Sequence, residues 1–184
     1  MELYSLSASI AGNINVHADQ DSSYYASAQL TFNESNVTIG CESDIDITAE
    51  GCGAHAELTF VDNSYADIYG DFFLGGYCGG WAELEVINSS VYFNYNNFNT
   101  NENSSIEVKA YTDNSSYMEL YSLSASIAGN INVHADQDYG SYASAQLTFN
   151  DSYVTIGCES DIDITAAGCG AHAELTFVDN SGAD

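Results

Sequence analysis

Arginine and proline are absent from the sequence, and Lys109 is its only lysine. Against this single positive charge stand 27 aspartates and glutamates, so the formal net charge of the 184-residue chain is −26. A surface of this charge repels nucleic-acid backbones and anionic lipid headgroups. We therefore expect no nucleic-acid partner and no binding to membrane surfaces.

Long apolar runs are missing as well. No apolar segment reaches the roughly 18 residues of a membrane-spanning helix, so we expect no membrane insertion. Residues 1–16 carry no basic segment, and we expect no signal peptide there. Apolar residues nevertheless make up 45% of the chain, which is enough to build a hydrophobic core. The composition therefore indicates a folded protein.

A long internal repeat organises the chain. Residues 118–184 repeat residues 1–67 with a period of 117 residues, and MELYSLSASIAGNINVHADQD recurs unchanged. Because Met118 is the counterpart of Met1, we expect that Met1 need not be an initiator and that the sequence is a window of a longer array. Seven of the 67 aligned positions differ: Ser22/Tyr139, Ser23/Gly140, Tyr24/Ser141, Glu34/Asp151, Asn36/Tyr153, Glu50/Ala167 and Tyr65/Gly182.

A shorter repeat lies inside the long one. The segments SAQLTF, HAELTF and WAELEV align on Leu30, Leu58 and Leu84, which are 28 and 26 residues apart. Apolar and polar residues alternate around these leucines, which is typical of strands with one buried face. We therefore predict that the three leucines occupy equivalent inward positions on successive turns of the chain.

The predicted fold class is all-β, with β-solenoid or stacked β-arch repeats. Units of about 27 residues with short strands and turns rich in Asn, Ser, Gly and Asp match one coil of a solenoid. The alternative is a set of β-sandwich or meander repeats. We expect residues 1–117 to form the first full long repeat, with units near 1–26, 27–53, 54–80 and 81–117, and residues 118–184 to form a partial second copy.

The cysteines are spaced in a regular way. Cys52 and Cys78 each lie six residues before an anchor leucine. Strands about 4.8 Å apart would bring such a pair close to disulfide range. A period also contains Cys41, and an odd number of cysteines leaves one thiol to pair outside its own period. The alternative is that the cysteines are small buried side chains that never oxidise.

A second interpretation of the cysteines is a metal site. Cys41, Cys52 and His55 follow the pattern C-x10-C-x2-H, which could hold zinc if a fourth ligand came from elsewhere. However, Trp81 occupies the position of His55 in the next unit, which favours a packed or exposed histidine. The same pattern recurs at Cys158, Cys169 and His172.

The acidic residues are spread along the chain, and no spacing marks a catalytic pair. Neither a calcium-binding EF-hand loop nor a nucleophile motif is present. We therefore expect no enzymatic activity and no cofactor, with calcium or other divalent cations bound diffusely. The sequon Asn-x-Ser/Thr marks candidate glycosylation sites at Asn33, Asn36, Asn88, Asn103, Asn114 and Asn150.

Sheet edges in this chain have little protection against pairing with other chains. Soluble β-proteins block their edges with proline, lysine or inward charges, and this sequence has no proline and one lysine. Near-identical repeats also allow like residues to stack in register. We therefore expect self-association through β-edges.

The chain combines the duplication, the scarcity of basic residues and the Gly-Cys-Gly turns at 51–53 and 168–170. In these features it resembles repetitive extracellular fibre and cell-sheath proteins, such as the tubular sheaths of filamentous methanogenic archaea. The resemblance implies a homopolymeric structural protein at the cell surface. It also implies a β-rich, disulfide-associated assembly with cross-linking positions at Cys41, Cys52, Cys78, Cys158 and Cys169. The alternative function is a surface adhesin repeat that binds carbohydrate or a partner protein through exposed tyrosines, Trp81 and asparagines.

Overall fold

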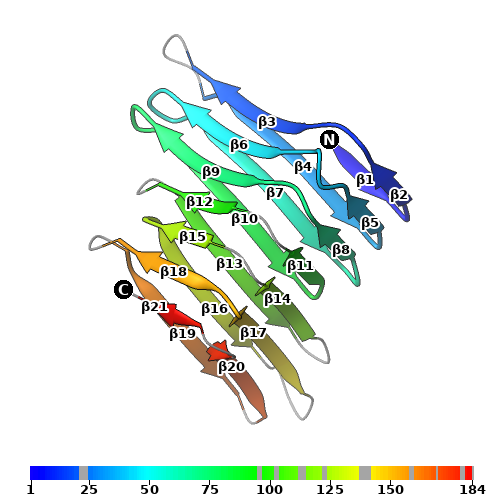
Figure 1. Cartoon of the computed structure of the whole chain (residues 1–184), viewed down its shortest axis with the longest axis vertical. Coiled ribbons are helices and arrows are strands. Elements are labelled where there is room, and N and C mark those ends of the chain that lie inside the picture. The colour runs from blue at the N-terminus through cyan, green and yellow to red at the C-terminus, as the bar shows by residue number, and fades with distance from the viewer. Residues whose placement is uncertain are drawn as a thin grey trace.

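A computed structural model shows a β-solenoid of about six turns, built from three parallel sheets that stack their strands along the long axis (Figure 1). The described part of the chain contains strands and turns but no helix. Within it, no helix is long and apolar enough to cross a membrane. The structure describes residues 1–20, 25–94, 97–101, 104–111, 115–121, 124–136, 142–157, 160–168, 170–178 and 181–183.

Each sheet contains seven strands, and successive strands of the chain visit the three sheets in turn. Sheet A consists of β1 (Glu2–Tyr4), β4 (Ser27–Asn33), β7 (His55–Val61), β10 (Trp81–Ile87), β13 (Ser104–Tyr111), β16 (Asn130–Asp136) and β19 (Ile162–Ala167). Sheet B consists of β2 (Ser7–Ile10), β5 (Asn36–Ile39), β8 (Tyr65–Ile68), β11 (Ser90–Asn94), β14 (Ser115–Tyr121), β17 (Ala143–Asn150) and β20 (Ala171–Val178). Sheet C consists of β3 (Ile14–Asp19), β6 (Ile45–Glu50), β9 (Phe72–Tyr77), β12 (Asn97–Thr100), β15 (Ser124–Ile127), β18 (Tyr153–Ile156) and β21 (Gly182–Ala183).

The anchor leucines confirm the predicted short repeat. Leu58 lies directly opposite Leu30 on one neighbouring strand and opposite Leu84 on the other. All three side chains are buried. Because side chains alternate between the two faces of a strand, this register places every second residue of each unit in the core.

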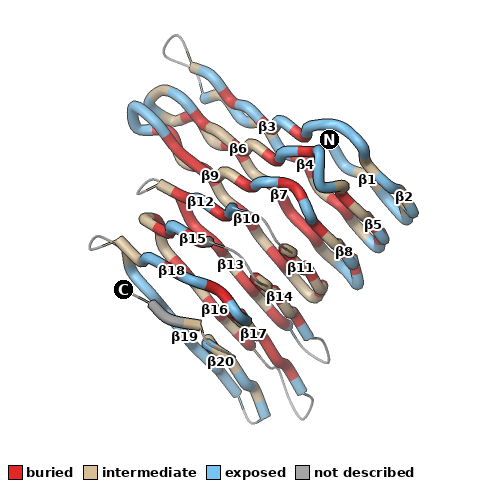
Figure 2. Tube along the Cα trace, viewed as in Figure 1, coloured by how far each residue is buried: buried red, intermediate tan, exposed pale blue. Residues whose placement is uncertain are grey.

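The core is a continuous column of apolar side chains inside the three sheets, and Figure 2 shows it as the buried stretches along the middle coils. Phe32 and Phe60 stack with ring centroids 5.2 Å apart and an interplanar angle of 11°. In the second copy Phe149 and Phe177 stack in the same way, at 5.0 Å and 11°. This pair of rings is therefore arranged alike in both copies.

The two copies nevertheless lie on different sides of the solenoid. The second copy begins thirteen strands after the first, so that β14 corresponds to β1 and β17 to β4. Since three strands make one coil, thirteen strands make four coils and one strand more. Thus β4 lies in sheet A, whereas its counterpart β17 lies in sheet B. The same sequence is accommodated on either side because the three sheets offer equivalent surroundings.

The length of a coil varies. Along sheet A the step from Leu84 to its partner Ile106 takes 22 residues, whereas the step from Ile131 to Ile162 takes 31. The turns at the corners absorb this difference, because the strands remain in register. The range 81–117 consequently contains β10 to β13 and the start of β14, which is more than one coil.

Buried serines form a ladder at the corner between sheets A and B. The backbone N–H of Ser35 donates to Ser64 Oγ at 3.1 Å, and that of Ser64 donates to Ser89 Oγ at 3.2 Å. In the second copy the N–H of Ser152 donates to Ser181 Oγ at 3.0 Å, at the corner between sheets B and C. These hydroxyls satisfy backbone groups that leave the sheets at the turns, where they would otherwise be buried without partners.

Candidate functional site

An acidic cluster on the outer face of sheet A surrounds the only lysine of the chain. Lys109 Nζ lies 2.8 Å from Glu85 Oε1 and also forms an ion pair with Glu107. The strands β10 and β13 bring these residues together, because Glu85 lies directly opposite Glu107. Glu83 completes the cluster and accepts a hydrogen bond from Ser105 Oγ at 3.3 Å.

Hydrogen bonds and neighbouring charges give these half-buried carboxyl groups different pKa values. Burial, a hydrogen bond with Glu107 and repulsion by Glu107 and Glu85 raise the pKa of Glu83 to about 8. The pKa of Glu107 is lowered, because hydrogen bonds from Lys109 and Glu83 outweigh its burial. Although burial opposes the charge of Lys109, hydrogen bonds to Glu107 and Glu85 raise its pKa. At neutral pH the raised pKa of Glu83 therefore favours its protonated form, and Lys109 keeps its positive charge.

These charges define what the cluster can do chemically. Among the described residues, one group of His, Cys, Asp or Glu side chains has ligand atoms within 4.8 Å of one another, namely Glu83, Glu85 and Glu107. Carboxylate oxygens are ligands that calcium accepts. However, Lys109 already forms ion pairs with Glu85 and Glu107, so the arrangement is that of an ion-pair network.

The zinc pattern does not come together in the structure. Cys41 follows β5 and Cys52 follows β6, so the six residues of β6 lie between them. An extended strand of this length spans about 20 Å, and the two thiols lie at different corners of the solenoid. His55 Nε2 instead lies 3.4 Å from Glu83 Oε2. The placement of His55 directly opposite Trp81 agrees with a site that accepts a flat ring.

Cys52 and Cys78 are neighbours but do not form the expected disulfide. Both are free and exposed, as is Cys41, and the Cys52 thiol donates to the backbone oxygen of Cys78 at 3.4 Å. The reason lies in the turn: four residues separate β6 from β7, but three separate β9 from β10. Counted from the preceding strands, Cys52 therefore falls one position further along than Cys78.

His17 and His134 make polar contacts between coils, whereas His172 contacts a residue of its own strand, β20. His17 Nδ1 lies 2.8 Å from Thr48 Oγ1, and in the second copy His134 Nδ1 lies 2.6 Å from Thr165 Oγ1. The repeated contact joins neighbouring strands on sheet C in the first copy and on sheet A in the second. His172 lies 3.4 Å from Glu174.

The sequons differ in accessibility. Asn36 is exposed, whereas Asn33, Asn88 and Asn150 are half-buried. Asn150 Nδ2 donates to Glu119 Oε1 at 2.8 Å, and Asn88 Oδ1 accepts from the backbone of Tyr111 at 2.9 Å. Among these four, Asn36 is therefore the most accessible acceptor. The predicted sites Cys158, Cys169, Asn103 and Asn114 lie outside the described residues.

Three tyrosines form a row on the outer face of sheet B. The ring centroid of Tyr92 lies 5.3 Å from that of Tyr65 and 5.5 Å from that of Tyr117. They come from β8, β11 and β14, which are adjacent in the sheet (Figure 1). We call this row the tyrosine ladder.

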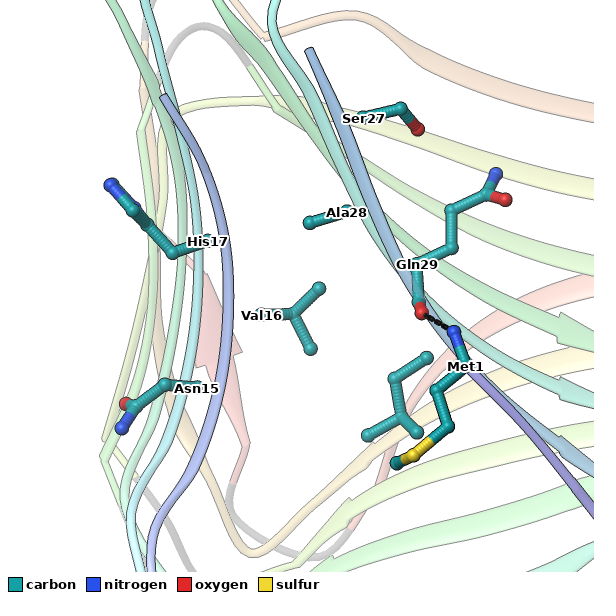
Figure 3. A pocket seen from close by; sticks show the side chains of 8 residues that line it. Met1, Asn15, Val16, His17, Ser27, Ala28 and Gln29 are labelled. Atoms are coloured by element: carbon teal, nitrogen blue, oxygen red, sulfur yellow. Dashed lines mark hydrogen bonds between the residues drawn. The ribbon is translucent and has the colours of Figure 1, made fainter. Parts of the chain in front are cut away.

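A pocket of about 360 Å³ opens at the N-terminal end of the solenoid. Figure 3 shows Val16 of β3 and Ala28 of β4 pointing into it, while His17 and Gln29 point away. The amino group of Met1 donates to the backbone oxygen of Gln29. The pocket is therefore the end of the apolar core at β3 and β4, where Val16, Ala28 and Leu30 face inward.

No protein family, curated protein or solved structure matches the chain. The functional assignment consequently depends on the geometry alone.

Sequence reasoning missed both the acidic cluster and the tyrosine ladder. Their members belong to strands 22 to 27 residues apart, and the step from β10 to β13 is shorter than the repeat spacing. The alternation in SSIEVKAY at 104–111 was the available signal for β13.

Proposed function

We propose that the chain is a structural protein that assembles with copies of itself through its β-edges into an extracellular filament, tube or sheath. The observation that carries this proposal is that one period already pairs with the next in parallel register, as β13 of the first period does with β16 of the second, while β1–β3 and β19–β21 are the edge strands of the described sheets. Such edges present unpaired backbone N–H and C=O groups that template pairing with another chain.

Exposed core-type side chains support the same proposal. Ile162 and Ile164 on β19 are each 43% exposed, whereas their first-copy counterparts Ile45 and Ile47 are buried beneath the following coil. Figure 2 shows the corresponding change from buried to exposed toward β19 and β20. A coil from a second copy would cover these side chains, and a head-to-tail contact of this kind does not close on itself but produces a filament.

The test is assembly of the purified protein, followed by sedimentation and negative-stain electron microscopy over a series of salt and chelator concentrations. Because the net charge is −26, we expect assembly to strengthen with ionic strength or calcium. Ile164→Asp should weaken assembly by placing a charge in the contact, whereas Thr165→Asp adds the same charge to the outward face of β19. A protein that remains monomeric throughout, or assembles best at low salt with chelator, would contradict the proposal.

Cross-linking by cysteine is part of the proposal. The exposed thiols of Cys41, Cys52 and Cys78 are accessible to thiols of other copies. We expect the native assembly to require a reductant, with heat or denaturant, for solubilisation. Titration of three unmodified thiols per period in native material would contradict this part.

A surface adhesin is the second candidate function, and the tyrosine ladder favours it. Its partly exposed aromatic rings, flanked by Asp67 and Glu119, provide apolar surfaces and hydrogen-bond acceptors that suit a sugar chain. A monomer that binds glycans, and loses binding in Tyr92→Ala, would favour the adhesin over the filament.

A further inference from the structure

The rings of the tyrosine ladder are held in contact by the sheet. Ser90 lies opposite Tyr65 on one side and opposite Tyr117 on the other, and Tyr92 lies two residues further along the same face. The ring plane of Tyr92 is tilted by 43° to that of Tyr65 and by 52° to that of Tyr117. Tyr65 is 39% exposed, and the other two rings are half-buried, so the ladder can be reached from solvent while its rings stay side by side.

The outer two phenols each have a proton acceptor. Tyr65 Oη donates to Asp67 Oδ1 at 3.1 Å, and Tyr117 Oη donates to Glu119 Oε2 at 3.0 Å. Burial and the negative charge of Asp67 raise the pKa of Tyr65 to about 12, and burial also raises the pKa of Tyr92 and Tyr117. The phenols therefore keep their protons at neutral pH. A carboxylate within hydrogen-bond distance can take such a proton when the ring loses an electron.

We propose that Tyr65, Tyr92 and Tyr117 form a dityrosine cross-linking site, which couples neighbouring rings when the protein meets a one-electron oxidant such as a haem peroxidase with hydrogen peroxide. The oxidant removes one electron from each of two phenols, and each phenol releases its hydroxyl proton. The two radicals join through a new bond between ring carbons ortho to the oxygens. The hydrogens on those carbons then move to the oxygens and restore two phenols. For each cross-link, one hydrogen peroxide is reduced to two waters.

Contact between the rings determines which tyrosines couple. Holding two reacting groups side by side raises their effective concentration far above that of freely diffusing side chains. Tyr92 lies between two partners and has an ortho carbon on either side of its hydroxyl, so it can couple with Tyr65 or with Tyr117. Each bond would join two neighbouring coils covalently, independently of any assembly between copies.

The single lysine provides a sharp assay, because Lys109 is the only trypsin site and lies between Tyr92 and Tyr117 in the sequence. Dilute protein is oxidised with peroxidase and hydrogen peroxide, quenched, denatured and digested. Band size on a denaturing gel then shows whether fragments 1–109 and 110–184 of one chain remain joined. Dityrosine fluorescence and mass spectrometry, which detects the loss of two hydrogens per bond, report all cross-links.

We expect the fragments of the oxidised wild type to remain partly joined. Tyr92→Phe keeps the ring but cannot couple, and should lower the joined fraction by about tenfold, because it removes the contact that raises the effective concentration. Tyr65→Phe should lower dityrosine fluorescence while leaving the fragments joined. Tyr142→Phe, which alters an exposed tyrosine outside the ladder, should change neither signal. Complete separation of the wild-type fragments, or an unchanged joined fraction in Tyr92→Phe, would overturn the proposal.

Discussion

Polar side chains of this protein act mainly between coils. Ser64 is buried, accepts the backbone N–H of Ser35, and donates through its hydroxyl to the backbone oxygens of Phe32 and Val61, 2.9 and 2.8 Å away. Glu83 likewise interacts with His55 on the coil before it and with Ser105 on the coil after it. Individual residues therefore stabilise the stacking of coils as well as their own turns.

The raised pKa of Glu83 predicts a dependence of stability on pH. The folded protein holds the proton of Glu83 up to a pKa of about 8, whereas the unfolded chain releases it near the ordinary glutamate pKa of 4.5. Stability contributed by this proton is fully present below the unfolded pKa and is lost as the pH rises through the folded pKa. The loss is on the order of 2 kcal/mol, since one pKa unit corresponds to about 1.4 kcal/mol and the shift is shared with coupled neighbours.

Chemical denaturation at a series of pH values checks this prediction. Glu83→Gln, which cannot ionise, should lose less stability than the wild type between pH 5 and pH 9, while Glu2→Gln, on the exposed first strand, should follow the wild type. Parallel curves for Glu83→Gln and the wild type would contradict the assigned role of this carboxyl group.

At the scale of strands, the duplication provides matched pairs in different surroundings. Ile47 on β6 and Ile164 on β19 share the local sequence Ile-Asp-Ile-Thr, but Ile47 is 0% exposed and Ile164 is 43% exposed. We expect Ile47→Ala to lower the free energy of unfolding by about 2–5 kcal/mol and Ile164→Ala by about 1 kcal/mol. Denaturant unfolding of the monomer, followed by the fluorescence of Trp81, measures both. Equal losses would show that the last coil is covered in solution.

Sequence patterns predicted those strands that recur at a constant spacing. The anchor leucines could be aligned because the steps between them, 28 and 26 residues, are nearly equal. The contact of Lys109 with Glu85 could not be predicted from the sequence. It depends on a step of 22 residues, which only the register of β10 and β13 reveals. The sheet to which a strand belongs could not be predicted either. Identical segments occupy different sheets, so their sequence does not indicate their position.

At the scale of the whole molecule, charge repulsion opposes the packed core. Twenty-seven acidic groups against one lysine repel one another, and salt screens them over a distance that falls to about 8 Å at physiological ionic strength. We therefore expect the thermal unfolding midpoint of the monomer to rise by several degrees from low to high sodium chloride. Calcium at equal ionic strength should give a similar rise if cations bind diffusely. A much larger rise with calcium would reveal specific sites, and a falling midpoint would contradict the screening argument.

The displacement of the duplicated sequence by one sheet has a consequence for any chain that carries more periods. Each further period would rotate its pattern by a third of a revolution and advance it by about 21 Å, since adjacent strands lie about 4.8 Å apart. Three periods would then place the same side chains on all three flanks, related by a screw axis. The three flanks of such a fibre would be equivalent. Neighbouring fibres could then make identical contacts with each flank and pack into a trigonal lattice.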